Sequence, residues 1–103
     1  MSRRPALDVL LQLRAISERL ARRSVVEASA AQVAADEHVH DLEEALADLS
    51  LPRDARTVEW VAAQASRRSM ATLVVVARER AEHEAAETAA ARAVWLERER
   101  ERE

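Results

Sequence analysis

The fold is decided by residues 6–49, which read ALDVLLQLRAISERLARRSVVEASAAQVAADEHVHDLEEALADL. Small and apolar residues recur through this stretch in steps of three or four. They are Val9, Leu13, Ile16, Leu20, Ser24, Ala28, Ala31, Ala35, Val39, Leu42, Leu46 and Leu49. This spacing keeps them on one face of an α-helix, so the stretch predicts one long helix with one seam to bury. Their mean step of about 3.64 residues exceeds the 3.5 of a strict heptad repeat, which predicts a nearly straight helix pair.

One break interrupts the helical pattern, at Pro52, because a proline pushes the residue before it out of the helical region. The sequence predicts a single domain, 1–103, with a helix over about 5–49, a turn over about 50–53, a helix over about 54–98 and a charged tail over 97–103. The second helix has its own stripe of small and apolar residues: Val58, Ala62, Ala65, Ser69, Thr72, Leu73, Val76, Ala77, Ala81, Thr88, Ala91, Val94 and Trp95.

The predicted fold is all-α, with two long helices forming an antiparallel coiled-coil hairpin. The chain has no glycine and only two prolines, so it lacks the turn residues that a sheet or barrel needs. A turn of a few residues makes the two helices antiparallel neighbours. Folding about residue 52 then pairs position i with about position 104 − i. The residues predicted to form the hairpin seam are Leu13, Ile16, Leu20, Ala28, Ala31, Ala35, Leu73, Val76, Ala91 and Trp95.

The composition argues against several classes of function. Charged residues make up 34% of the chain with both signs mixed and a net charge of −3, which is typical of a solvated helix surface and not of a nucleic-acid-binding face. There is no cysteine for a disulfide or a zinc site, and the three histidines do not converge on one face of a hairpin. Two paired helices offer no concave pocket, so we expect no catalytic residues, metal site, cofactor or enzymatic activity.

The hydropathy pattern indicates whether the chain enters or crosses a membrane. No apolar run approaches the roughly 20 residues that span a bilayer. The N-terminus lacks the pattern of a signal peptide, because charged residues interrupt the apolar segment that follows its basic start. We therefore expect a cytoplasmic protein without a membrane span.

The first turns of the first predicted helix are apolar nearly all round. Leu7, Leu10 and Leu11 point away from the predicted seam, and at the open end of the hairpin they are expected to lie near Leu96. A cluster of exposed apolar residues marks an interface, whereas single ones mean little. We therefore predict a partner-binding site formed by Leu7, Leu10, Leu11, Arg14 and Leu96.

Residues 5–14, PALDVLLQLR, resemble the start of FliJ-type proteins, the small stalk components of flagellar and related type III secretion export machines. Members of that family commonly have a short leucine-rich segment leading into an antiparallel pair of long charged helices. The resemblance implies a non-enzymatic protein that docks on the hexameric export ATPase, promotes assembly of its ring, couples it to the export gate and helps to recycle export chaperones. Contact with a membrane would then be peripheral, through the membrane complex of the machine.

The alternative is a structural or adaptor hairpin, unrelated to secretion, that self-associates through its exposed apolar residues. A two-helix unit of this size buries little apolar surface, so it is only marginally stable alone, and a partner is favoured under either hypothesis. The alternative predicts a homodimer or a four-helix bundle, whereas the stalk hypothesis predicts a monomer that binds the ATPase through one tip.

Overall fold

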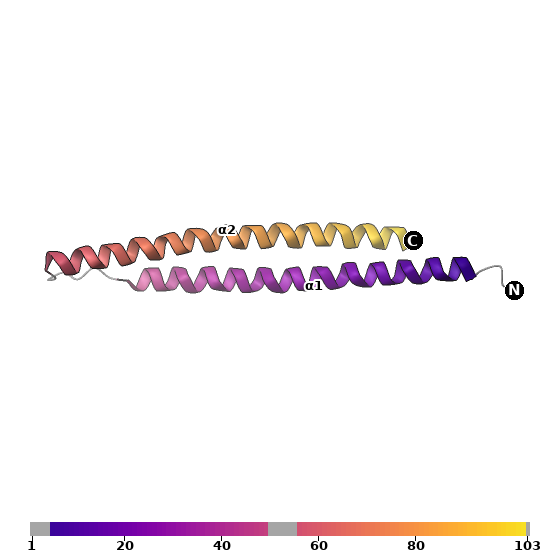
Figure 1. Ribbon diagram of the computed structural model, residues 1–103, viewed down its shortest axis with the longest axis horizontal. Coiled ribbons are helices and arrows are strands. Elements are labelled where there is room, and N and C mark those ends of the chain that lie inside the picture. The colour runs from indigo at the N-terminus through magenta and orange to yellow at the C-terminus, as the bar shows by residue number, and fades with distance from the viewer. Residues whose placement is uncertain (1–4, 50–55, 103) are drawn as a thin grey trace. The chain divides into compact units, whose positions relative to one another are not determined.

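The computed structural model describes residues 5–49 and 56–102 and contains two α-helices in this part of the chain (Figure 1). Helix α1 spans Pro5–Asp48 and helix α2 spans Thr57–Arg102. The all-α hairpin predicted from the sequence is confirmed. The predicted turn over residues 50–53 lies outside the described residues.

Both helices begin where their sequences favour a helix start. Pro5 is the first residue of α1, where its missing N–H group costs no hydrogen bond. Asp8 and Glu59 place a carboxylate in the first turn of α1 and α2, where it interacts favourably with the positive end of the helix dipole.

Helix α2 is displaced along the chain from its predicted bounds of 54–98. It begins at Thr57 and continues to Arg102. The alternating Glu/Arg sequence at its end forms ion pairs three residues apart, Arg98–Glu101 at 3.2 Å and Arg100–Glu97 at 3.9 Å. Such pairs support a helix on its exposed face, so this segment is helical and not a separate tail.

The chain forms two compact units. Of the described residues, unit 1 comprises 5–32 and 84–102, and unit 2 comprises 33–49 and 56–83. In each unit a segment of α1 lies beside a segment of α2 that runs in the opposite direction (Figure 1). The pairing in each unit is therefore that of an antiparallel hairpin.

The predicted register between the helices is wrong. In unit 1 the indole of Trp95 contacts Glu18, whereas folding about residue 52 would place Ala86 there. In unit 2 Arg78 contacts Glu43, whereas the same rule would place Val61 there. The register depends on which side chains meet in the seam, and the position of the turn alone does not determine it.

The buried and half-buried residues of each helix recur in alternating steps of three and four. In α1 they include Glu18, Ala21, Val25, Ala28, Gln32, Ala35, Val39, Leu42, Leu46 and Leu49; in α2 they include Met70, Val74, Ala77, Ala81, Glu84, Thr88, Ala91 and Trp95. This is the spacing of a coiled coil, with a mean step close to 3.5 residues. The observed seam is therefore heptad-based, in contrast to the predicted mean step of about 3.64.

This spacing explains which predicted seam residues are correct. Ala28, Ala35, Ala91 and Trp95 are half-buried. The other six are exposed, so their assignment to the seam is wrong: Leu13, Ile16, Leu20, Ala31, Leu73 and Val76. A stripe with a step above 3.5 residues drifts relative to a heptad seam. The stripe predicted for α1 thus begins on an outer face and reaches the seam only at Ala28.

Candidate protein-binding site

The start of α1 exposes three leucines. Leu7, Leu10 and Leu11 are 47%, 46% and 52% exposed. Leu11 precedes Glu18 by seven residues and Leu7 precedes Ala21 by fourteen, so both continue the heptad positions of the seam. Leu7 and Leu11 are therefore apolar residues on the side of α1 that faces α2 further along unit 1.

These leucines are exposed because α2 covers little of this part of α1. Trp95 lies beside Glu18, so in an antiparallel pair the last helical residue of α2, Arg102, is level with about Leu11. Leu7 lies beyond that level. Within unit 1, Figure 1 shows the start of α1 reaching past the end of α2. Within the described residues, α2 therefore does not cover this short apolar end of the coiled-coil seam.

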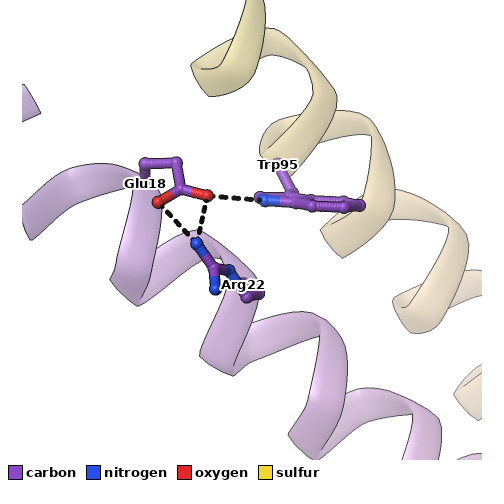
Figure 2. Close-up of polar contacts among 3 residues, drawn as sticks. All are labelled: Glu18, Arg22 and Trp95. Carbon is purple, nitrogen blue, oxygen red and sulfur yellow. Dashed lines mark hydrogen bonds and ion pairs between the residues drawn. The ribbon is translucent and has the colours of Figure 1, made fainter. Parts of the chain in front are cut away.

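Next to this apolar end, a buried carboxylate lies in the seam (Figure 2). Glu18 is only 2% exposed. Its Oε1 accepts a hydrogen bond of 2.7 Å from Nη2 of Arg22 and one of 3.2 Å from Nε1 of Trp95. Its Oε2 accepts a second hydrogen bond from Nη2 of Arg22, at 2.9 Å. A buried charge is tolerated only when it is paired and hydrogen-bonded, and both conditions are met here.

The three residues of this cluster differ in what they contribute. Arg22 lies one turn after Glu18 on α1, and its side chain is 57% exposed, so it compensates the carboxylate from the solvent edge of the seam. Trp95 comes from α2 and is half-buried. The hydrogen bond from Trp95 to Glu18 joins the two helices, so it favours the helix register that brings these two residues together.

The predicted binding residues are only partly brought together. Leu7, Leu10 and Leu11 share the start of α1, and Arg14 is exposed one turn further along. Leu96 is exposed but is level with the turn around residue 17, about 9 Å along the helix from Leu11 at about 1.5 Å per residue. The expected proximity of Leu96 to the leucine cluster is therefore wrong, because the register differs from the predicted one.

The apolar pattern alone assigns no role to Glu18, which is one of the charged residues that interrupt the apolar segment near the N-terminus. A signal for it was present. Leu11, Glu18, Val25, Gln32, Val39 and Leu46 are spaced by seven residues each. Heptad spacing places Glu18 on the seam, and a charged residue on a seam suggests a specific polar contact with the partner helix.

Within residues 5–49 and 56–102, neither helix has a segment long and apolar enough to cross a membrane. In the same part of the chain, no three histidine, aspartate or glutamate side chains are grouped so that they could bind a metal ion.

No protein-family model, no curated protein and no solved structure matches this chain. Its function is therefore inferred from the side chains exposed at the start of α1 and from the contacts beside them.

Proposed function

We propose that this chain is a non-enzymatic coiled-coil accessory protein of a flagellar or type III export apparatus. In this role it docks on the hexameric export ATPase in the cytoplasm, promotes assembly of the ring and couples it to the export gate. The proposal is supported by the resemblance of residues 5–14 to FliJ-type proteins. The observation that carries it is the exposure of Leu7, Leu10 and Leu11 at one end of the seam.

An uncovered seam end is suited to docking into an apolar groove. Helices that bind grooves present apolar residues at steps of three and four, and Leu7, Leu10 and Leu11 have this spacing. Exposed Arg14, one turn on, adds a cation beside the leucines. Near the end of α2, Arg98 forms an ion pair with Glu101 and Arg100 forms one with Glu97, so paired charges of α2 lie close to the leucines of α1.

The proposal is tested by purifying the tagged chain with the export ATPase from the same genome and measuring ATP turnover and the hexameric fraction in parallel. The intact chain should bind the ATPase and raise both quantities. A variant with Leu7→Ser and Leu11→Ser should lose binding and stimulation while keeping its helical circular dichroism, because both side chains are already half-exposed.

The matched control is Leu73→Ser. Leu73 is 51% exposed, close to the exposure of Leu11, but belongs to unit 2. This variant should bind and stimulate like the intact chain. Absence of binding by the intact chain, or equal loss in the control, would reject docking through the start of α1.

A further inference from the structure

A second apolar surface lies on the outer side of α1. Val9, Leu13, Ile16 and Leu20 are 52%, 57%, 44% and 58% exposed. They are spaced by four, three and four residues, so they form one continuous stripe on the helix. At about 100° per residue, Ile16 and Leu20 each lie about 160° around the helix from Glu18. This outer stripe therefore faces away from α2.

The described part of the chain buries little apolar surface of its own. Its buried apolar residues are Ala21, Val74 and Ala77, whereas seventeen large hydrophobic residues are exposed. A pair of helices with so small a core gains stability by covering more apolar surface. The outer stripe places four exposed large residues on the side of α1 that faces away from α2, so its burial against a partner would add substantially to this small core.

We infer that the outer stripe binds the outer stripe of a second copy of this chain, with the two α1 helices antiparallel. The steps of four, three and four residues read the same in both directions. An antiparallel pairing centred between Leu13 and Ile16 therefore sets Leu13 against Ile16 of the other copy and Val9 against its Leu20. Each contact then joins a stripe residue to a stripe residue, as a twofold interface requires.

Charges beside the stripe fit the same arrangement. Asp8 and Arg19 are both exposed and are separated by eleven residues, so they lie about 20° apart on one edge of α1. In an antiparallel pair related by a twofold axis, this edge faces the same edge of the other copy. The midpoint of Asp8 and Arg19 is within one residue of the midpoint of the stripe. The pairing thus brings each Asp8 close to Arg19 of the other copy, twice, by symmetry.

A parallel pairing does not bring Asp8 to Arg19, because the edge that carries both residues then lies on opposite sides of the interface in the two copies. Beyond Leu20 the stripe positions are occupied by Arg23 and Glu27, which form an exposed ion pair at 3.1 Å. This pair ends the apolar part of the stripe and limits how far the two copies can shift along each other.

A dimer departs from the monomer that the stalk hypothesis predicts from the sequence. It is nevertheless compatible with docking to an ATPase, because Leu7 and Leu11 lie on the seam side of α1 and the stripe lies on its outer side. The chain contains no cysteine, so single cysteines can be introduced without background. Val9→Cys and Leu20→Cys variants are oxidised separately and as a mixture, and the linked peptides are identified by mass spectrometry. Val75→Cys, at an exposed site in unit 2, is the control.

The expected result is a disulfide between Val9→Cys and Leu20→Cys in the mixture, at least tenfold more abundant than links within either variant alone or with the control. Light scattering should give a mass of about twice 11.5 kDa for the intact chain, and Leu13→Glu with Ile16→Glu should weaken dimerisation at least tenfold. Leu7→Ser with Leu11→Ser should leave dimerisation unchanged, even where it abolishes ATPase binding.

Reversal of charge provides an independent measurement. Asp8→Arg should weaken the dimer about three- to tenfold, and Arg19→Asp in the same chain should restore it. Disulfides formed by each single variant with itself would overturn the antiparallel arrangement. A monomer at every concentration would overturn a second copy as the occupant of the stripe and would assign the surface to a different protein.

Discussion

Replacing Trp95 by phenylalanine tests whether the hydrogen bond between the helices stabilises the fold. Phenylalanine keeps an aromatic ring at this half-buried site but lacks the indole N–H that donates to Glu18 at 3.2 Å. Hydrogen bonds to charged groups contribute about 1.5–3 kcal/mol. Because this one is long and Glu18 keeps both hydrogen bonds from Arg22, we expect the lower end, a loss of about 1.5 kcal/mol in the free energy of unfolding.

The assay is urea unfolding followed by circular dichroism at 222 nm, at one fixed protein concentration. The midpoint should fall with an unchanged m-value, since the substitution does not alter the surface exposed on unfolding. For a domain of this size, the loss corresponds to a fall of about 6–12 °C in the melting temperature. The control is Trp60→Phe, because Trp60 is 45% exposed in the first turn of α2, and its effect should stay within about 0.5 kcal/mol.

A double-mutant cycle isolates the contact. In a chain carrying Glu18→Gln the acceptor is neutral and its hydrogen bond is weaker, so Trp95→Phe should cost about 0.5–1 kcal/mol there. Two results would refute the conclusion that a charged hydrogen bond links the two helices. One is an equal loss for Trp95→Phe and Trp60→Phe, and the other is the same loss for Trp95→Phe whether or not the chain carries Glu18→Gln.

Three further predictions concern contacts within each unit. Val74→Ala should lower the free energy of unfolding by about 1.5–2.5 kcal/mol, because Val74 is only 3% exposed. Val75→Ala, at a 52% exposed site, should change it by less than about 0.5 kcal/mol. Urea titration compares the two variants, and similar losses would contradict the assignment of Val74 to the seam. Arg78→Gln removes the partly exposed ion pair with Glu43 and should cost at most about 1 kcal/mol, a loss that shrinks in 1 M NaCl; a loss independent of salt would exclude an electrostatic origin. Thr88→Val should change stability by less than about 0.5 kcal/mol, because the Thr88 hydroxyl donates within its own helix, to the Glu84 carbonyl; thermal melting giving a larger loss would mean that the hydroxyl has a further partner.

Local sequence determined the helices themselves. Long runs without glycine, apolar residues at steps of three and four, Pro5 at a helix start and Pro52 between two helical patterns predicted both helices and their antiparallel pairing. Helix α1 ends at Asp48, one residue from its predicted end. The start of α2 is less well predicted, because helix boundaries depend on local capping contacts that the apolar pattern does not contain.

The choice of face was decided by tertiary structure. The part of α1 that belongs to unit 1 has two faces that could form a seam with α2. The outer face contains Leu13, Ile16 and Leu20, and the inner face contains Ala21 and Val25. Hydrophobicity of the single helix favoured the outer face, because its side chains are larger. Pairing with α2 uses the inner face, where small residues allow close approach of the helices.

The position of Glu18 shows the same division. A single helix pattern treats a glutamate as a surface residue, and its burial becomes favourable only when Trp95 from the other helix and Arg22 complete its hydrogen bonds. The sequence of each helix thus determined which segments are helical and at what spacing their apolar residues recur. Which faces meet, and in which register, is a property of both helices together, because the free energy of a seam depends on the pairs of side chains that it brings into contact.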